Sequence, residues 1–233
     1  HCGTGAVRCV YMVAGATLIG FTLTNGATMP YNGGALEQMG GGVLATGDAT
    51  ISNCWILGNV AGAYGGGMYY GSAYDCIIDG NYANSAGGVQ YGYSVVNCRI
   101  SNNGAETSAG GTAQCYTMIS NCVFVRNSCA LFGGGDASSA VYYNCAFISN
   151  SAMYGGGFYS AGGAAYDCLI ADNKGSYGGG VYSGVSLYNC TVVSNCVPSG
   201  GYEGGGVTGA TKLYNSIVYS NLAGGVVDNY ATF

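Results

Sequence analysis

Acidic side chains are the first candidates for chemistry in this sequence, because hydrolysis of a glycosidic bond needs two carboxylates about 5–10 Å apart. The sequence contains repeat units of 22–24 residues, and Asp75 and Asp167 hold equivalent positions in two units that are four apart. At the spacing of stacked strands this separation is roughly 19 Å. Asp79 and Asp172 each follow one of these residues, but an intervening strand separates each pair by roughly 13 Å or more. These spacings do not bring two carboxylates together.

The remaining candidates for acid–base or metal chemistry stand alone. Asp136 and Glu203 have no second acid close by in the sequence, and the single histidine, His1, is the first residue. The stretch "GGGDASS" around Asp136 matches part of a calcium-binding repeat, but the other repeat units lack its aspartate. We therefore expect no catalytic site, no metal site and no cofactor.

Cysteine is the next reactive residue type, and the sequence has 12 cysteines. Seven recur at steps of 22, 22, 24, 23, 23 and 22 residues: Cys54, Cys76, Cys98, Cys122, Cys145, Cys168 and Cys190. Zinc needs four ligands that converge tetrahedrally, which a single line of thiols cannot supply. Stacked side chains lie ~4.8 Å apart, whereas the Cβ atoms of a disulfide are ~3.8 Å apart.

These seven cysteines are expected to form an unbonded ladder of small inward side chains in a narrow corner, with disulfide bridges between coils as the alternative. Gly20 and Ser216 fill the same place at the two ends of the series, which indicates that side-chain size matters more there than sulfur. Cys2 and Cys9 are the other pair that we consider for a local disulfide.

In every repeat unit an asparagine stands five residues after the position of the recurring cysteine. The nine positions are Asn25, Asn59, Asn81, Asn103, Asn127, Asn150, Asn173, Asn195 and Asn221. A ligand site would use one or two units rather than all of them, so a structural role is favoured over ligand binding. We expect a buried ladder in which each amide hydrogen-bonds to the coils above and below, and losing one such amide to cost ~1–3 kcal/mol.

A fixed period of 22–24 residues is the mark of a solenoid. Helices are disfavoured by two or three glycines per unit together with Val, Ile and Tyr, so the units read as short parallel strands. The Asn-Cys step, the later Asn and a Gly pair mark three corners. We predict an all-β parallel β-helix of about nine coils with three short strands per coil. It forms one domain over residues 1–233, with an irregular longer insertion at 26–50, and is a segment of a longer chain.

Two motifs carry a resemblance to a known group of repeats. Phe124-Val125-Arg126-Asn127 and Phe147-Ile148-Ser149-Asn150 match FxxN, while Gly87-Gly88-Val89, Gly179-Gly180-Val181 and Gly205-Gly206-Val207 match GGA(I/L/V) with Gly in third place. The chain resembles the passenger repeats of polymorphic outer-membrane proteins and of large secreted bacterial β-helix proteins. The resemblance implies a right-handed β-helix, surface display or secretion, and adhesion.

Composition narrows the range of partners. Charged residues make up 6% of the chain, the formal net charge is −5, and the five Lys and Arg residues are spread out, which argues against nucleic acid. No apolar run approaches the ~20 residues needed to span a membrane. Low charge with many Tyr, Ser, Thr and Asn suits an extracellular or cell-surface location.

Tyrosine is the main surface feature, with 22 residues. Five lie two residues before the cysteine place: Tyr74, Tyr143, Tyr166, Tyr188 and Tyr214. Stacking between coils stiffens the sheets by perhaps ~0.5–1 kcal/mol per pair, and the same rings would form an aromatic strip that grips sugars or proteins.

We therefore expect a non-enzymatic extracellular structural or adhesive solenoid. Its expected partners are other copies of itself, joined head to tail or side by side into a fibre, and surface glycans or host or neighbour-cell proteins. The alternative is a carbohydrate-binding or polysaccharide-degrading β-helix.

Overall fold

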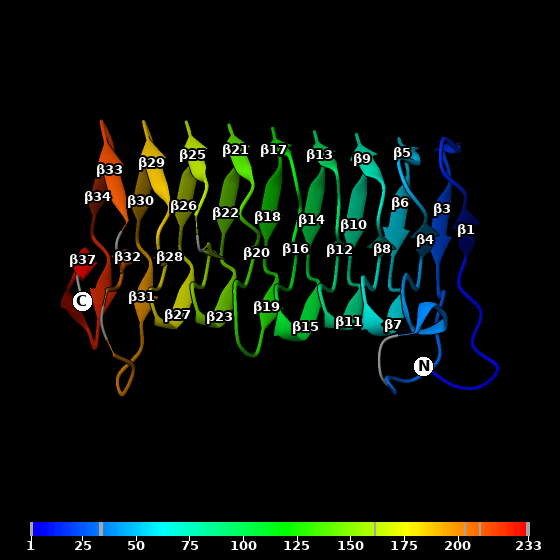
Figure 1. Cartoon of the computed structure of the whole chain (residues 1–233). Helices are drawn as coiled ribbons and strands as arrows, with labels where there is room; N and C mark the ends of the chain where they lie inside the picture. The colour runs from blue at the N-terminus through cyan, green and yellow to red at the C-terminus, as the bar shows by residue number, and fades with distance from the viewer. Residues whose placement is uncertain (1, 33–34, 161, 203, 210, 232–233) are drawn as a thin grey trace.

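The computed structural model describes residues 2–32, 35–160, 162–202, 204–209 and 211–231, so His1 and Glu203 lie outside the described residues. The chain forms an all-β parallel solenoid of about eight turns, slightly fewer than the nine expected (Figure 1). Each strand pairs in register with its equivalent in the neighbouring coils, as Ile78 does with Ile56 and Ile100. No helix in the described part of the chain is long and apolar enough to cross a membrane.

Each regular coil contributes four strands rather than the three expected, one to each of four sheets. The first sheet contains β1 (Val10–Met12), β4 (Val43–Ala45), β8 (Met68–Tyr69), β12 (Val89–Gln90), β16 (Thr112–Ala113), β20 (Asp136–Ala137), β24 (Phe158–Tyr159), β28 (Val181–Tyr182), β32 (Val207–Thr208) and β37 (Tyr230–Ala231). The second sheet contains β2 (Thr17–Ile19), β5 (Thr50–Ser52), β9 (Ser72–Tyr74), β13 (Ser94–Val96), β17 (Met118–Ser120), β21 (Val141–Tyr143), β25 (Ala164–Tyr166), β29 (Ser186–Tyr188) and β33 (Lys212–Tyr214).

The third and outer sheets complete the coil. The third sheet contains β3 (Thr22–Thr24), β6 (Trp55–Leu57), β10 (Ile77–Asp79), β14 (Arg99–Ser101), β18 (Val123–Val125), β22 (Ala146–Ile148), β26 (Leu169–Ala171), β30 (Thr191–Val193) and β34 (Ile217–Tyr219). The outer sheet contains β7 (Val60–Tyr64), β11 (Tyr82–Ser85), β15 (Gly104–Ser108), β19 (Ser128–Cys129), β23 (Ser151–Tyr154), β27 (Lys174–Tyr177), β31 (Cys196–Val197), β35 (Leu222–Ala223) and β36 (Val226–Val227), with β36 antiparallel to β35.

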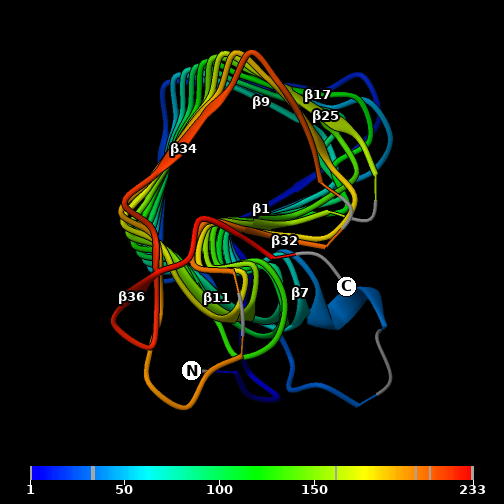
Figure 2. The same ribbon diagram turned by 90° about the vertical axis from the view of Figure 1, so that its left-hand side faces the viewer.

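The first three sheets enclose the main core, and the outer sheet lies against the far face of the first (Figure 2). In one coil the core receives Val89, Val95 and Ile100, all fully buried, from the first, second and third sheets. Side chains on either side of Val95 and Ile78 are more exposed, which is the alternation expected of a half-buried strand.

The fourth strand was missed because its inward side chains are small, as Ala61, Ala83 and Ala105 are in β7, β11 and β15. Ala86, Ala109 and Ala113 form a separate buried cluster, with Ala137 packed against it, between the outer and first sheets. Alanines give no apolar alternation to read. The Gly pairs then return the chain to the first sheet, since a Cβ added at Gly66 would lie 2.4 Å from the Tyr82 carbonyl oxygen.

The corner between the second and third sheets depends on a left-handed residue. The Asn or Asp that precedes each cysteine place has φ between 46° and 55°: Asn53, Asp75, Asn97, Asn121, Asn144, Asp167, Asn189 and Asn215. Asn and Asp adopt this conformation at lower cost than other side chains with a Cβ. The Asn-Cys step therefore turns the chain as its sequence predicts.

The stretch 26–50 mixes irregular and regular structure. It contains a single helical turn, η1 (Leu36–Gln38), and isolated bridges join Ala27 to Val60 and Met39 to Tyr64. The chain returns to the stack at β4, so the final part of this stretch follows the regular coil. Residues 33–34 lie outside the described residues.

Candidate functional site

The asparagine line forms a continuous hydrogen-bonded column at the corner between the third and outer sheets. The eight residues from Asn59 to Asn221 are at most 1% exposed. Asn127 is representative: its Nδ2 donates to the Ile100 carbonyl (2.9 Å) and to Asn150 Oδ1 (3.0 Å). Its Oδ1 accepts from both the backbone N–H and Nδ2 of Asn103. All of its side-chain hydrogen-bonding groups are thus used inside the fold.

Asn25 does not belong to this column, which corrects the frame of the first coil by one residue. Thr22 pairs with Trp55, so Gly26 rather than Asn25 lies at the place of Asn59. The Gly26 N–H donates to Asn59 Oδ1 (2.8 Å), while Asn25 is exposed with φ 59°. The column gains a member at its other end, because Asn221 Nδ2 donates to Asn229 Oδ1 (3.1 Å).

The cysteine line is also buried, and all 12 cysteines are free thiols, Cys2 and Cys9 included. Cys98 shows the pattern: its N–H donates to Cys122 Sγ (3.4 Å), and its own thiol donates to the Val96 carbonyl (3.2 Å). Ser216 acts in the same way, accepting from Cys190 N–H (3.0 Å) and donating to the Tyr214 carbonyl (2.9 Å). From Cys54 to Ser216 the place therefore holds a small side chain that both donates and accepts.

Gly20 does not hold this place in the first coil, since the same one-residue shift puts Phe21 there. The Phe21 N–H donates to Cys54 Sγ (3.4 Å), and Gly20 takes the left-handed corner with φ 76°. Cys9, which lies just before β1, donates its thiol to Asn59 Oδ1 (3.4 Å), and burial raises its pKa. A thiol whose pKa is raised by burial is a poor nucleophile, because little of it is thiolate at neutral pH.

Three carboxylates at or beside coil corners accept hydrogen bonds from the next coil. Asp75 Oδ1 accepts from Asn97 Nδ2 (3.0 Å), Asp167 Oδ1 accepts from Asn189 Nδ2 (3.2 Å), and Asp79 accepts from Asn102 Nδ2 (2.6 Å). In the described part of the chain, no three His, Cys, Asp or Glu residues come together as metal ligands would.

One acid departs from this pattern: Asp136 is fully buried in the first sheet, at a place that is apolar in most coils. Its carboxylate accepts from the hydroxyls of Thr112 and Tyr142, and from the backbone N–H (2.7 Å) and Oγ (3.0 Å) of Ser138. Ser138 Oγ in turn accepts from the Cys115 N–H (3.0 Å). Sequence reasoning left Asp136 alone, because Ser138 and Tyr142 of its own coil carry no charge and Thr112 comes from the preceding coil.

Burial controls the protonation of this cluster. It raises the pKa of Asp136 from 3.8 to about 6, although the four hydrogen bonds favour the charged form. Burial also raises the pKa of Cys115 to about 12, and the nearby Asp136 adds to the effect. The pKa of Tyr142 rises well above its usual value for the same two reasons. At neutral pH the cluster therefore holds a buried negative charge.

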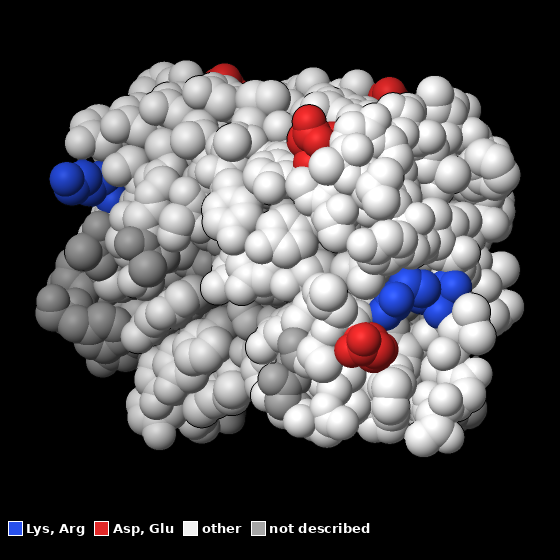
Figure 3. All heavy atoms as spheres, turned by 45° about the vertical axis from the view of Figure 1, so that its right-hand side comes forward, with Lys and Arg blue, Asp and Glu red and all other residues white. Residues whose placement is uncertain are grey.

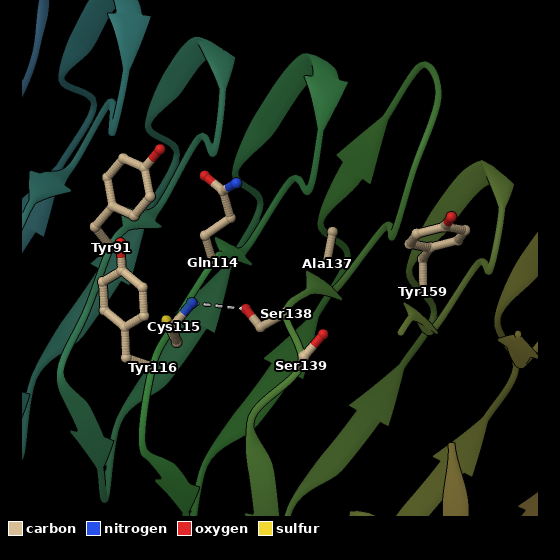
Figure 4. A pocket seen from close by; sticks show the side chains of 8 residues that line it. All are labelled: Tyr91, Gln114, Cys115, Tyr116, Ala137, Ser138, Ser139 and Tyr159. Atoms are coloured by element: carbon tan, nitrogen blue, oxygen red, sulfur yellow. Dashed lines mark hydrogen bonds between the residues drawn. The ribbon is translucent and has the colours of Figure 1, made fainter. Parts of the chain in front are cut away.

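A hollow of about 510 Å³ lies over this cluster (Figure 4). Its lining residues are Tyr91, Gln114, Cys115, Tyr116, Ala137, Ser138, Ser139 and Tyr159. Tyr91 and Tyr116 lie at one end with their rings 5.7 Å apart and nearly parallel, and Tyr159 lies at the other end. Ser138 thus belongs both to the buried cluster and to the lining of the hollow.

The tyrosine strip is continuous over four coils. Tyr143, Tyr166, Tyr188 and Tyr214 stack on the outside of the second sheet, with ring centroids 5.1, 4.7 and 4.5 Å apart. Tyr74 is separated from them, because Val96 and Ser120 occupy the two intervening places. Beside the strip runs a row of exposed amides, in which Asn144 donates to Asn121 and Asn215 donates to Asn189.

The fold and these sites define the chain as a parallel β-solenoid. No family model, no curated protein and no solved structure matches it. The surface carries few charges, and on the face shown in Figure 3 the charged side chains are isolated from one another or in a single mixed group.

Proposed function

We propose that this chain is a non-enzymatic structural or adhesive solenoid that acts outside the cell. The observation that carries the proposal is the stacked strip of Tyr143, Tyr166, Tyr188 and Tyr214, whose outer members are 43% and 46% exposed. Large aromatic side chains dominate the energy of protein contacts. Stacking holds these rings in place before binding, which lowers the entropy lost on association.

The regular architecture supports a scaffold role. The Asn and Cys columns use their polar groups inside the fold, and the exposed carboxylates of Asp75 and Asp167 bond to neighbouring amides. This leaves the strip and its row of amides as a flat surface on a rigid rod. The low content of charged residues, 6%, favours contact with uncharged surfaces. We take a second copy of the chain, packed side by side through the strip, as the first partner.

The repeat type also belongs to this proposal. Phe124 of the FxxN motif is fully buried and Asn127 lies in the corner column. The Gly-Gly-Val motif at Gly87 begins the close return to the first sheet. Both motifs thus fall where the passenger repeats of polymorphic outer-membrane proteins would need them, which supports a surface-displayed or secreted chain.

Sedimentation equilibrium of the purified chain tests the adhesive role of the strip. The double variant Tyr166→Ser/Tyr188→Ser removes its centre, and Tyr82→Ser, an exposed tyrosine on the outer sheet, is the matched control. We expect the wild type and the control to associate with rising concentration and the double variant to remain monomeric. Equal molecular weights for the wild type and the double variant across the concentration range would contradict the proposal.

A further inference from the structure

We propose that the hollow over Asp136 is a binding site for one pyranose ring of a neutral oligosaccharide. This inference goes beyond the scaffold role and does not depend on the tyrosine strip, with which the hollow shares no residue. It rests on the shape of the hollow, its aromatic ends, its polar groups and its lack of exposed charge.

The hollow is a local departure from the repeat. Along the first sheet the outward place holds Tyr69, then Gln90, Ala113 and Ala137, and further on Tyr159 and Tyr182. Large rings on both sides thus bound a stretch that contains one glutamine and two alanines. A second hollow of about 500 Å³, on the outer sheet beside Lys174, has no aromatic lining residue. The aromatic ends therefore distinguish the hollow over Asp136 from a simple groove between coils.

The aromatic ends suit the apolar face of a sugar ring. The rings of Tyr91 and Tyr116 are stacked, differ by 9° in orientation and both appear face-on in Figure 4. Tyr116 is 54% exposed although it packs on Tyr91 and Tyr93. The C–H groups of a pyranose pack on such aromatic faces, and the ring hydroxyls remain at its edge for hydrogen bonds.

Polar groups line the space between the aromatic ends. Gln114 Oε1 accepts from Gln90 Nε2 (2.6 Å), which directs the Gln114 NH₂ group along the hollow toward Tyr159 (Figure 4). Ser139 is exposed at the rim. Ser138 is held by two hydrogen bonds to Asp136 and one from Cys115, so the lining is fixed before a ligand arrives. A few fixed polar groups among aromatic walls are the usual composition of a small-molecule site.

Charge selects a neutral sugar. None of the eight lining residues, all within the described part of the chain, is Lys, Arg, Asp or Glu. The nearest charge is the buried carboxylate of Asp136, which disfavours sulfated or uronic-acid sugars and nucleotides. A neutral hexose, with an apolar face and hydroxyl edges, fits these features.

Saturation-transfer NMR and calorimetric titration with cellotetraose, maltotetraose and fully N-acetylated chitotetraose test the site. We expect at least one of these neutral tetrasaccharides to bind the wild type. Tyr116→Ala removes one exposed ring and should weaken that binding about tenfold. Tyr202→Ala, which changes a tyrosine that is 63% exposed and stacked on Tyr177 away from the hollow, should leave it unchanged.

A filling variant separates loss of binding from loss of fold. Ser139→Trp adds a large side chain at the exposed rim and should abolish binding while the far-ultraviolet circular dichroism stays that of the wild type. The inference is overturned if no tetrasaccharide binds the wild type, or if a filled hollow binds as well as the open one. Failure here leaves the sedimentation result untouched, because the strip variants lie outside the hollow.

Discussion

Two inner columns of the same coils follow opposite rules. At the corner between the third and outer sheets, the same asparagine recurs in the eight coils from Asn59 to Asn221. On the first sheet, the inward place changes from Met68 and Val89 to Thr112 and Asp136, and then back to Phe158. Both columns are buried, yet one is uniform and polar while the other is apolar with a polar interruption.

The difference shows what repetition is for in this fold. The asparagine corner needs a neutral group that bonds to both neighbouring coils, so each coil must supply the same residue. The first sheet needs only apolar volume and tolerates variation. A buried carboxylate in that column has no structural reason to recur. The carboxylate of Asp136 lies beside the hollow that has tyrosines at both ends. Positions that hold the same residue in every coil thus reflect the needs of the fold, whereas positions that differ from the rest of their column point to a functional site.

The largest expected effect is that of breaking the uniform column. Asn127→Ala removes the acceptor of the Asn103 N–H and a donor to the Ile100 carbonyl, both in the interior. Each buried group left unpaired costs about 1–3 kcal/mol, so we expect a loss of roughly 3–5 kcal/mol in the free energy of unfolding. Urea titration measures it. Arg126→Ala, at the exposed neighbouring residue, is the control, and equal midpoints for the two variants would remove the column from the account of stability.

The buried carboxylate of Asp136, which interrupts the apolar column, should make the stability of the chain depend on pH. The pKa of Asp136 is about 6 in the folded chain against 3.8 ordinarily, so folding favours its protonated form. The stabilisation that comes from protonating Asp136 in the folded chain is complete below about pH 3.8 and is lost as the pH rises through 6. The free energy of unfolding falls by on the order of 3 kcal/mol over this range. In urea titrations from pH 4 to 7.5, Asp136→Asn should lose less stability than the wild type. Parallel profiles for the two proteins would show that Asp136 is not the titrating group.

The cysteine line should respond to chemistry rather than to size alone. Cys122→Ser keeps an acceptor for the Cys98 N–H, as Ser216 does for Cys190, and should change stability by less than about 1 kcal/mol. Cys122→Val fills the space without an acceptor and should cost about 1–3 kcal/mol more. Thermal unfolding of both variants decides between these roles. Equal losses would mean that the place selects for volume.

The smallest effect is expected on the outer surface. Tyr166→Ser removes two stacking contacts, with Tyr143 and Tyr188, and should cost about 0.5–1 kcal/mol for each. Tyr74→Ser lies at an equivalent place outside the stacked strip and serves as the matched control. A differential scanning calorimetry experiment should place the melting temperature of Tyr166→Ser below that of Tyr74→Ser. The reverse order would argue against stacking as a source of stability.

The sequence was sufficient for the solenoid and for most of its columns, because a period written in identical residues needs no three-dimensional information. It misplaced Asn25 because an Asn-Gly pair in the first coil resembles the corner one residue out of register. It missed Asn229, which reaches the column only eight residues after Asn221, outside the period. These two errors concern residues at the ends of the regular repeat. A second kind of error came from features that leave no repeating pattern in the sequence.

The fourth strand and the polar cluster belong to that second kind. The outer strands pair buried alanines such as Ala61, Ala83 and Ala105 across coils, so hydrophobic alternation does not mark them. Asp136, Thr112 and Tyr142 are unremarkable one by one, and the register of two neighbouring coils brings their side chains together. A reading of the sequence that asks which positions break their own column would have singled out Thr112 and Asp136.

The direction of the amides in the asparagine column has an electrical consequence. Each side-chain NH₂ group points to the oxygen of the next asparagine along the chain, in eight successive links from Asn59 to Asn229. No link runs the other way among them, so the amide dipoles add instead of cancelling, as peptide dipoles do in an α-helix. The column gives the rod a built-in polarity, with its positive end toward the carboxyl-terminal coils. Two such rods lying side by side would lower their electrostatic energy by packing antiparallel.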